Sequence, residues 1–150
     1  LIFVTSDTSN YQNPQKPFSN FEDFVKNRSR IPLLIIGGNI KKPYQEMRYF
    51  SQIDLAPTIM DILGFPYTNS WMGNSMLKSD NDSLAYTNRP GNYWSVMGLK
   101  GSYYNEADHK DHFFGFNNNH HLKLEYKQMG KDWINTVKWL LQENKIWYEE

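Results

Sequence analysis

The sequence contains no cysteine, which excludes disulfide bonds and zinc sites with cysteine ligands. It has no excess of either charge, because 16 Lys and Arg residues balance 16 Asp and Glu residues. Without surplus basic side chains the chain lacks the main driving force for binding nucleic acid, so we expect no nucleic-acid partner. It also lacks an apolar run of about 18 residues, the length that a membrane-spanning helix requires. We therefore expect no membrane span within this segment, while an anchor in upstream sequence stays open.

What the chain does have is apolar and aromatic material for a folded core. Hydrophobic residues make up 39% of the 150 residues and charged residues 21%, which is typical of a globular domain. Aromatic residues reach 16%, with ten Tyr, nine Phe and five Trp. Exposed Trp71 and Trp94 side chains in a groove would indicate a carbohydrate-binding domain, but core packing is the simpler interpretation. The length corresponds to one domain or to part of a larger one.

Two short apolar runs, Leu1–Val4 and Ile31–Ile36, predict buried strands of one central sheet. Small polar residues or glycines follow each run and mark the strand ends. Pro32 has no N–H group for a sheet, so it must lie near the start of its strand or on an edge. Because two strong strands make only a thin sheet, we expect residues 1–150 to be the C-terminal portion of a single domain whose first half lies upstream.

Three segments carry the pattern of helices. Phe18–Asn27 is expected to hold a short helical turn. The segment Asp54–Gly64 begins with a natural N-cap and ends with a typical C-terminal glycine. The apolar residues that share one face of this predicted helix are Leu55, Ile59, Ile62 and Leu63. A long amphipathic helix is predicted over Leu122–Glu143, in which Gly130 costs about 1 kcal/mol relative to Ala.

The strand signals between the last two helices are weaker. Short strands of an antiparallel region are predicted at Ser83–Thr87, Tyr93–Leu99 and His112–Phe116, separated by glycines and by segments rich in Asn and Asp. Ser70–Asp82 is predicted to be a loop with a short apolar anchor at Met76-Leu77. The fold class is therefore α/β, with a sheet and flanking helices, small antiparallel strands and a C-terminal helix.

Three stretches occur in an order that resembles the C-terminal half of the sulfatase family, within the alkaline phosphatase superfamily. They are VTSD at Val4–Asp7, RIPLLIIG at Arg30–Gly37, and SQIDLAPTIMDILGF at Ser51–Phe65, which WMGNSML at Trp71–Leu77 follows. Within the family the chain looks most similar to the membrane-anchored branch of lipoteichoic acid synthases and phosphoglycerol or phosphoethanolamine transferases. The resemblance covers the first half of the chain and implies a partial sulfatase-like domain.

The resemblance maps Asp7 onto the metal-binding aspartate of that family, at the end of a sheet strand. Side chains at this end of a strand face the crevice where α/β proteins bind ligands, and a carboxylate there holds divalent cations. The family has His or Asn next, whereas this chain has Thr8, a weaker ligand for Zn²⁺ or Mn²⁺. The implied cofactor of the full protein is one divalent metal ion: Mn²⁺, Zn²⁺, Mg²⁺ or Ca²⁺. The alternative is that Asp7 is a turn carboxylate that accepts backbone N–H groups.

By the same resemblance, the nucleophilic Thr, Ser or modified Cys lies upstream, so no catalytic residue is expected in this chain and Thr58 belongs to the fold signature. The expected function of the full protein is transfer of phosphoglycerol or phosphoethanolamine to a lipid or glycan of the cell envelope, from a phospholipid or glycan ester substrate. An arylsulfatase-type hydrolase and a non-catalytic binding protein are the alternatives. The resemblance also implies the extracytoplasmic domain of a bacterial membrane protein, anchored through an upstream segment.

Four histidines offer a second possible metal site. His109 and His112 are three residues apart, and His120 and His121 are adjacent. A spacing of three places two imidazoles on one face of a helix, but this segment lacks a helical apolar pattern. We therefore expect the histidines in solvated loops. Gly37-Gly38 is not expected to bind phosphate, because no Lys and Ser or Thr follow it at the spacing of a phosphate-binding loop.

Overall fold

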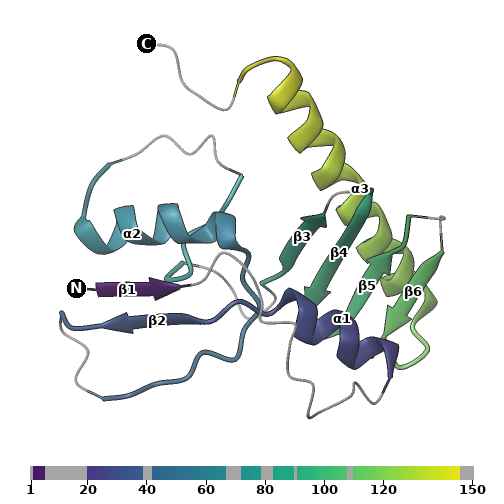
Figure 1. Ribbon diagram of the computed structural model, residues 1–150, viewed down its shortest axis with the longest axis horizontal. Helices are drawn as coiled ribbons and strands as arrows, with labels where there is room; N and C mark the ends of the chain where they lie inside the picture. The colour runs from purple at the N-terminus through teal and green to yellow at the C-terminus, as the bar shows by residue number, and fades with distance from the viewer. Residues whose placement is uncertain are drawn as a thin grey trace. The chain divides into compact units, whose positions relative to one another are not determined.

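The computed structural model describes residues 2–5, 20–38, 42–66, 72–78, 83–89, 91–107 and 110–145. The fold is mixed α/β, as expected, with two small antiparallel sheets and a C-terminal helix (Figure 1). The chain divides into two compact units, Leu1–Glu46 and Met47–Glu150. No helix among the described residues combines the length and the apolar character that crossing a bilayer requires.

The first unit contains β1 (Ile2–Thr5), α1 (Phe21–Ser29) and β2 (Leu33–Ile36). The two strands pair antiparallel, which confirms that both apolar runs belong to one sheet, and the proline at position 32 directly precedes β2. The expectation that these strands are buried is wrong for this chain: Ile2 is 59% exposed and Ile36 is 47% exposed. Apolar side chains occupy both faces of the pair.

The helix α1 is longer than the single turn that the sequence predicts. The side chain of Asn20 accepts a hydrogen bond from the Asp23 N–H at 2.9 Å and so caps its first turn. Val25 is 3% exposed, and the rings of Phe21 and Phe24 stack with centroids 6.0 Å apart. The apolar side chains of α1 therefore lie together, as the sequence pattern indicates.

The second unit begins with the 3-10 turn η1 (Gln52–Asp54), which leads into α2 (Leu55–Leu63). Gly64 ends α2 in the left-handed conformation with φ 70°, and its N–H bonds to the Asp61 carbonyl. The helix boundaries are therefore confirmed. On the predicted apolar face, Leu55, Ile59 and Ile62 are half-buried. Pro57 and Thr58 are the buried residues of α2, while Leu63 is 54% exposed.

A four-stranded antiparallel sheet forms the rest of the second unit together with the last helix. The strands are β3 (Ala85–Arg89), β4 (Tyr93–Gly98), β5 (Gly101–Asn105) and β6 (Asp111–Phe114), in that spatial order. Three of them confirm the predicted strands, with shifted ends. The sequence interpretation missed β5, because it took Gly101 as a strand breaker. Gly101 instead opens β5 directly opposite Gly98, at the tight turn between β4 and β5.

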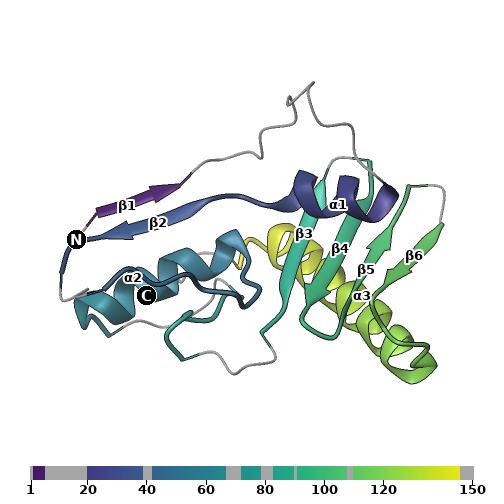
Figure 2. The same cartoon turned by 90° about the horizontal axis from the view of Figure 1, so that it is seen from below.

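The helix α3 (His120–Gln142) crosses one face of this sheet (Figure 2). It confirms the predicted C-terminal helix, which begins two residues earlier than the apolar pattern indicates. Asn119 caps it by accepting a hydrogen bond from the Leu122 N–H at 3.0 Å. The core between helix and sheet contains four aromatic residues, Trp94, Tyr103, Phe116 and Tyr126, together with Val96 and Ile134. Core packing is therefore confirmed for Trp94, which is 8% exposed, whereas Trp71 lies outside the described residues.

Gly130 lies where α3 comes closest to the sheet. A Cβ atom at this position would be 2.0 Å from Trp94 Cζ3 and 2.8 Å from Val96 Cγ2. Real Cβ atoms do not approach other atoms this closely, so only glycine fits here. The helix propensity lost at Gly130 is therefore the consequence of a close contact between α3 and β4.

Candidate functional site

The predicted metal aspartate follows β1, whose last residue, Thr5, lies opposite Leu33 at the start of β2. The Thr5 hydroxyl donates a hydrogen bond to the Pro32 carbonyl at 2.9 Å, which fixes this end of the strand pair. Asp7 and Thr8 lie outside the described residues. Their role as metal ligands therefore stays a prediction.

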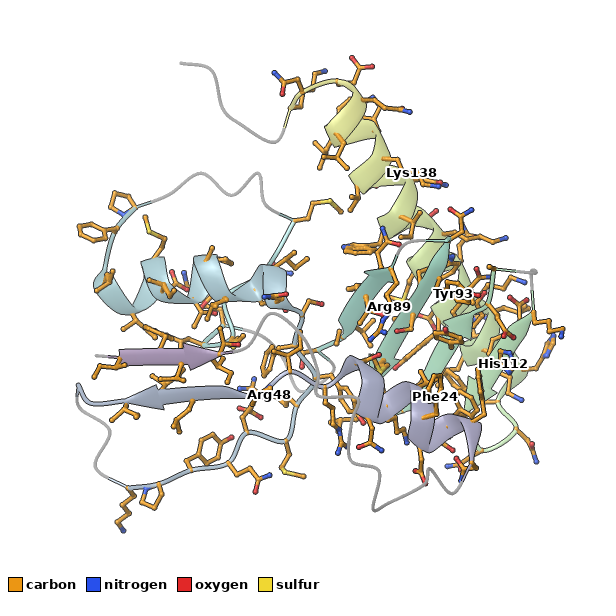
Figure 3. All side chains as sticks on the ribbon, viewed as in Figure 1. Phe24, Arg48, Arg89, Tyr93, His112 and Lys138 are labelled. Atoms are coloured by element: carbon orange, nitrogen blue, oxygen red, sulfur yellow. The ribbon has the colours of Figure 1, made fainter. Side chains whose placement is uncertain are left out.

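The second possible metal site, at the histidines, is only partly described. His112 lies on β6 (Figure 3). Its ring contacts the rings of Tyr104 and Phe114, and its Nε2 is 3.0 Å from Glu106 Oε2. The expectation of a loop histidine is therefore wrong for His112, because its segment pairs with β5. His120 and His121 are exposed in the first turn of α3, and His109 lies outside the described residues. Within the described ranges, no three His, Asp or Glu side chains come together to hold a metal ion.

One polar group of the second unit that joins several segments is the carboxylate of Asp54, in the segment Ser51–Phe65 of the resemblance. Its Oδ2 accepts a hydrogen bond from the Ser51 N–H at 2.7 Å, and its Oδ1 accepts one from the Asn74 N–H at 2.8 Å. Asp54 occupies the N-cap position of α2, as predicted. The predicted capping by its side chain is wrong, because the carboxylate accepts no hydrogen bond from the first N–H groups of that helix. The carboxylate instead binds back to the residue before η1 and across to the loop at residues 72–78.

Two further contacts extend this connection to the helix and to the sheet. The Thr58 hydroxyl donates to the Asp54 carbonyl at 2.6 Å and accepts from the Met76 N–H at 2.9 Å. The Ser51 hydroxyl accepts from the Tyr86 N–H of β3 at 2.6 Å. We call the group Ser51, Asp54, Thr58 and Asn74 the polar clip. It joins η1, α2, the loop and β3.

Gly73 allows the loop to approach η1 closely enough for the polar clip to form. A Cβ atom at Gly73 would lie 2.1 Å from the Ile53 carbonyl oxygen. The predicted apolar anchor Met76-Leu77 is wrong for Leu77, which is 63% exposed, whereas Met76 is half-buried and Ser75 is 3% exposed. Backbone approach and hydrogen bonds hold this loop, and its most apolar side chain points to solvent.

The electrostatics of the polar clip follow from its burial. Burial raises the pKa of the Asp54 carboxyl above its ordinary value, while the N–H groups of Asn74 and Ser51 oppose the rise. Burial also raises the pKa of Tyr86, and the nearby charge of Asp54 adds to this shift. Both oxygens of Asp54 already accept backbone hydrogen bonds, so the carboxylate has a structural role.

A salt bridge at the edge of the loop reinforces its attachment to α2. Lys78 Nζ lies 2.6 Å from Asp61 Oδ1. The hydrogen bond from Lys78, followed by one from Ser75, holds the pKa of Asp61 below its ordinary value. The loop is thus attached to η1 through Asn74 and to α2 through Met76 and Lys78.

A second polar cluster, which the sequence interpretation missed, lies between the sheet and α3. The Tyr103 hydroxyl donates a hydrogen bond to Asp111 Oδ1 at 2.6 Å, and Lys127 of α3 forms an ion pair with Asp111 Oδ2. Burial raises the pKa of Tyr103, and the hydrogen bond to Asp111 raises it further. For Asp111, burial acts to raise the pKa, but the hydrogen bonds from Lys127 and Tyr103 outweigh it and the net shift is downward. This cluster ties β5, β6 and α3 together.

No local sequence signal identifies the Tyr103 cluster, because its members are far apart in the chain. Lys127 is 16 residues from Asp111, and the two meet only because α3 folds back over the sheet. The polar clip is different: Ser51, Asp54 and Thr58 fall within one short segment with the spacing of a turn and a helix. The family resemblance identifies this segment, but it does not predict the hydrogen bonds that the segment makes.

Comparisons with known proteins place this chain beside sulfatases. No family model matches it. It is similar to arylsulfatase K of Danio rerio, with 25% identity over 101 residues that cover 67% of this chain and 19% of that protein. It is also similar to arylsulfatase K of Bos taurus, with 29% identity over 82 residues that cover 55% of this chain and 15% of that protein. No solved structure matches.

These similarities support a relationship to the sulfatase family. They give no support to the expected closer resemblance to lipoteichoic acid synthases and phosphoglycerol or phosphoethanolamine transferases. Sulfatases in general depend on a metal ion, but Asp7 with Thr8 beside it is an incomplete ligand set for any of the four expected ions. The matched segment spans less than a fifth of either relative, at 19% and 15% of their lengths.

Proposed function

We propose that this chain is the C-terminal part of a sulfatase-type domain and that the full protein hydrolyses sulfate esters. The observation that carries the proposal is the similarity to arylsulfatase K of two vertebrates. The order of elements supports it, because a strand that ends just before Asp7 is followed by β2 and then by the turn and helix of the polar clip. The comparisons give no support to phosphoglycerol or phosphoethanolamine transfer, our expectation from sequence.

In this proposal the chain supplies one metal ligand and a scaffold. Asp7 would hold a divalent metal ion together with residues from the rest of the domain, and that ion would supply Lewis-acid chemistry at the ester. The polar clip and the Tyr103 cluster act as structure, since their carboxylates are already engaged within the protein. The nucleophile is expected upstream, so the 150-residue chain alone should be inactive. The phospholipid or glycan ester substrate, the extracytoplasmic location and the upstream anchor stay predictions.

The test is hydrolysis of 4-nitrocatechol sulfate by the full protein, with calorimetric titration of Mn²⁺, Zn²⁺, Mg²⁺ and Ca²⁺. We expect Asp7→Asn to lower the rate of hydrolysis by about 100-fold or more and to weaken metal binding. The matched control is Asp132→Asn, which alters an exposed carboxylate of α3 and should change neither.

Three outcomes would contradict the proposal. Equal activity in Asp7→Asn and in the wild type would remove the metal role of Asp7. Cleavage of bis(4-nitrophenyl) phosphate without cleavage of the aryl sulfate would favour a phosphoryl-group transferase. An absence of both metal binding and hydrolysis in the wild type would favour a non-catalytic binding protein.

A further inference from the structure

The charged residues of α3 are separated onto different sides of the helix. At about 100° per residue, all of its lysines fall within an arc of about 80°. Its two acidic residues, Glu125 and Asp132, lie about 145° from the middle of that arc. We call these lysines the lysine stripe: Lys123, Lys127, Lys131 and Lys138.

The stability of an isolated helix does not account for this arrangement. Lys127 lies four residues from Lys123 and from Lys131, and like charges at this spacing destabilise a helix. No lysine of the stripe has an acidic residue of α3 three or four positions away. The ordinary arrangement is found in α1, where Lys26 forms a salt bridge with Glu22 four residues earlier. A departure from a local rule of stability is often found at a functional surface.

The sheet engages only the N-terminal part of the stripe. Lys127 forms the ion pair with Asp111 of β6, and Lys123 Nζ lies 5.9 Å from the centroid of the Phe113 ring. Lys131 and Lys138 are exposed, and neither forms an ion pair with another residue that the structure describes. The C-terminal part of the stripe therefore presents positive charge that the described protein does not neutralise.

Two exposed leucines lie on the same side of α3 as the lysines. Leu124 is 51% exposed and Leu141 is 60% exposed, and together with the stripe they occupy an arc of about 100°. Lysines and exposed leucines on one helix are typical of helices that lie on a membrane, with the charges at the headgroups and the leucines at the boundary with the acyl chains. A soluble polyanion would bind the lysines but would leave the leucines in water.

We propose that the lysine stripe, with Leu124 and Leu141, docks α3 on the surface of an anionic membrane. Charge complementarity supports this choice, because four basic residues on an amphipathic helix are enough to recognise anionic headgroups. From Lys123 to Leu141 the helix rises about 27 Å, so that it contacts several headgroups at once when it lies along the surface. This peripheral contact goes beyond the hydrolysis of sulfate esters and does not require it.

The test is cosedimentation of the full protein, freed of any membrane-spanning segment, with vesicles of phosphatidylcholine that contain roughly one third phosphatidylglycerol. We expect Lys131→Glu with Lys138→Glu to weaken binding by about 30-fold or more, because each lysine near such a surface contributes roughly a factor of five. Leu124→Ser with Leu141→Ser should weaken binding by about tenfold. Added NaCl should weaken binding of the wild type, and vesicles of phosphatidylcholine alone should not bind it.

The matched control is Lys42→Glu with Lys100→Glu, which makes the same change in net charge at exposed lysines outside α3. Its binding should stay within about threefold of the wild type. The melting temperature of every variant should equal that of the wild type, since all the changed side chains are exposed.

Three outcomes would overturn the proposal. The first is that the wild type binds anionic vesicles no better than neutral ones. The second is that the stripe variant and the control variant lose binding equally. The third is that dextran sulfate binds as tightly as the anionic vesicles and that the leucine variant binds both as well as the wild type does, because a soluble polyanion would then be the partner. None of these readouts uses catalysis, so a protein that binds vesicles without hydrolysing sulfate esters would contradict the proposed function alone.

Discussion

The two sheets of this chain differ in how deeply their apolar side chains are buried. In the β3–β6 sheet, Val96 and Tyr103 are 0% exposed beneath α3. In the β1–β2 pair, Val4 is 51% exposed and Leu34 is 55% exposed. An apolar strand therefore indicates that its side chains require burial, but it does not indicate which element of the fold buries them. The second unit holds the helix that covers its sheet, whereas β1 and β2 of the first unit keep most of their side chains exposed.

The polar contacts show the same difference. The polar clip and the Tyr103 cluster each join at least three elements of the second unit through buried or half-buried groups. In the first unit, the described side-chain bond between the strands is that of the Thr5 hydroxyl to the Pro32 carbonyl, and it is exposed. We therefore expect substitutions to lower the free energy of unfolding more in the second unit than in the first. The following four predictions are given in order of expected effect, and the third compares the two units directly.

Gly73→Ala should have the largest effect. The added Cβ would lie 2.1 Å from the Ile53 carbonyl oxygen, a backbone atom that cannot rotate away. We expect the free energy of unfolding to fall by about 3 kcal/mol or more, measured by urea denaturation. Gly64→Ala is the control, because a Cβ atom there meets no other atom within 4 Å. Its only cost is the strain of an alanine at a φ of 70°, so the free energy of unfolding should fall by about 1 kcal/mol. Equal losses in the two variants would mean that the loop does not need its close approach to η1.

Gly130→Ala should also destabilise the second unit, although alanine is the better helix former by about 1 kcal/mol. The methyl group would overlap Trp94 and Val96, and overpacking of this kind typically costs up to about 3 kcal/mol. We expect a net loss of about 2 kcal/mol by thermal denaturation followed at the tryptophan near-ultraviolet signal. A gain in stability would show that α3 lies farther from β4 than we describe.

The same substitution placed in both sheets gives a direct comparison. Val96→Thr puts a hydroxyl into a site that is 0% exposed, and we expect a loss of about 2 kcal/mol. Val4→Thr changes a side chain that is 51% exposed, and in the 150-residue chain it should stay within about 0.5 kcal/mol of the wild type. Urea denaturation of both variants measures the difference. Similar losses would remove the contrast between the two sheets.

Asp111→Asn should have a smaller effect that depends on pH. The folded pKa of Asp111 lies below its ordinary value, so its contribution to stability is complete above that ordinary value and is lost as the pH falls through the lowered one. We expect a loss of about 1 kcal/mol at neutral pH and a smaller loss near pH 3. Asp132→Asn, on the exposed face of α3, should leave the pH profile of urea denaturation unchanged. A loss for Asp111→Asn that does not vary with pH would contradict the ion pair with Lys127.

Most helices and strands follow from local patterns in the sequence, and the failures have physical causes. α3 and the end of α2 at Gly64 are predictable, because amphipathic period and left-handed glycine are local signals. β5 was missed because a glycine that starts a strand at a tight turn looks the same as one that breaks it. The bonds of Asp54 to Asn74 and of Lys127 to Asp111 join distant segments, so no local pattern indicates them. The candidate metal ligands Asp7 and Thr8 rest on resemblance and stay predictions.

Hydrogen exchange of the backbone amides, measured in the 150-residue chain and in the full protein, tests the central difference between the two units most directly. In the 150-residue chain we predict slow exchange at paired amides of β4 and β5 and fast exchange throughout β1 and β2. In the full protein, β1 and β2 should become as protected as β4 and β5. Slow exchange of β1 and β2 in the 150-residue chain, or fast exchange of both strands in the full protein, would contradict the account.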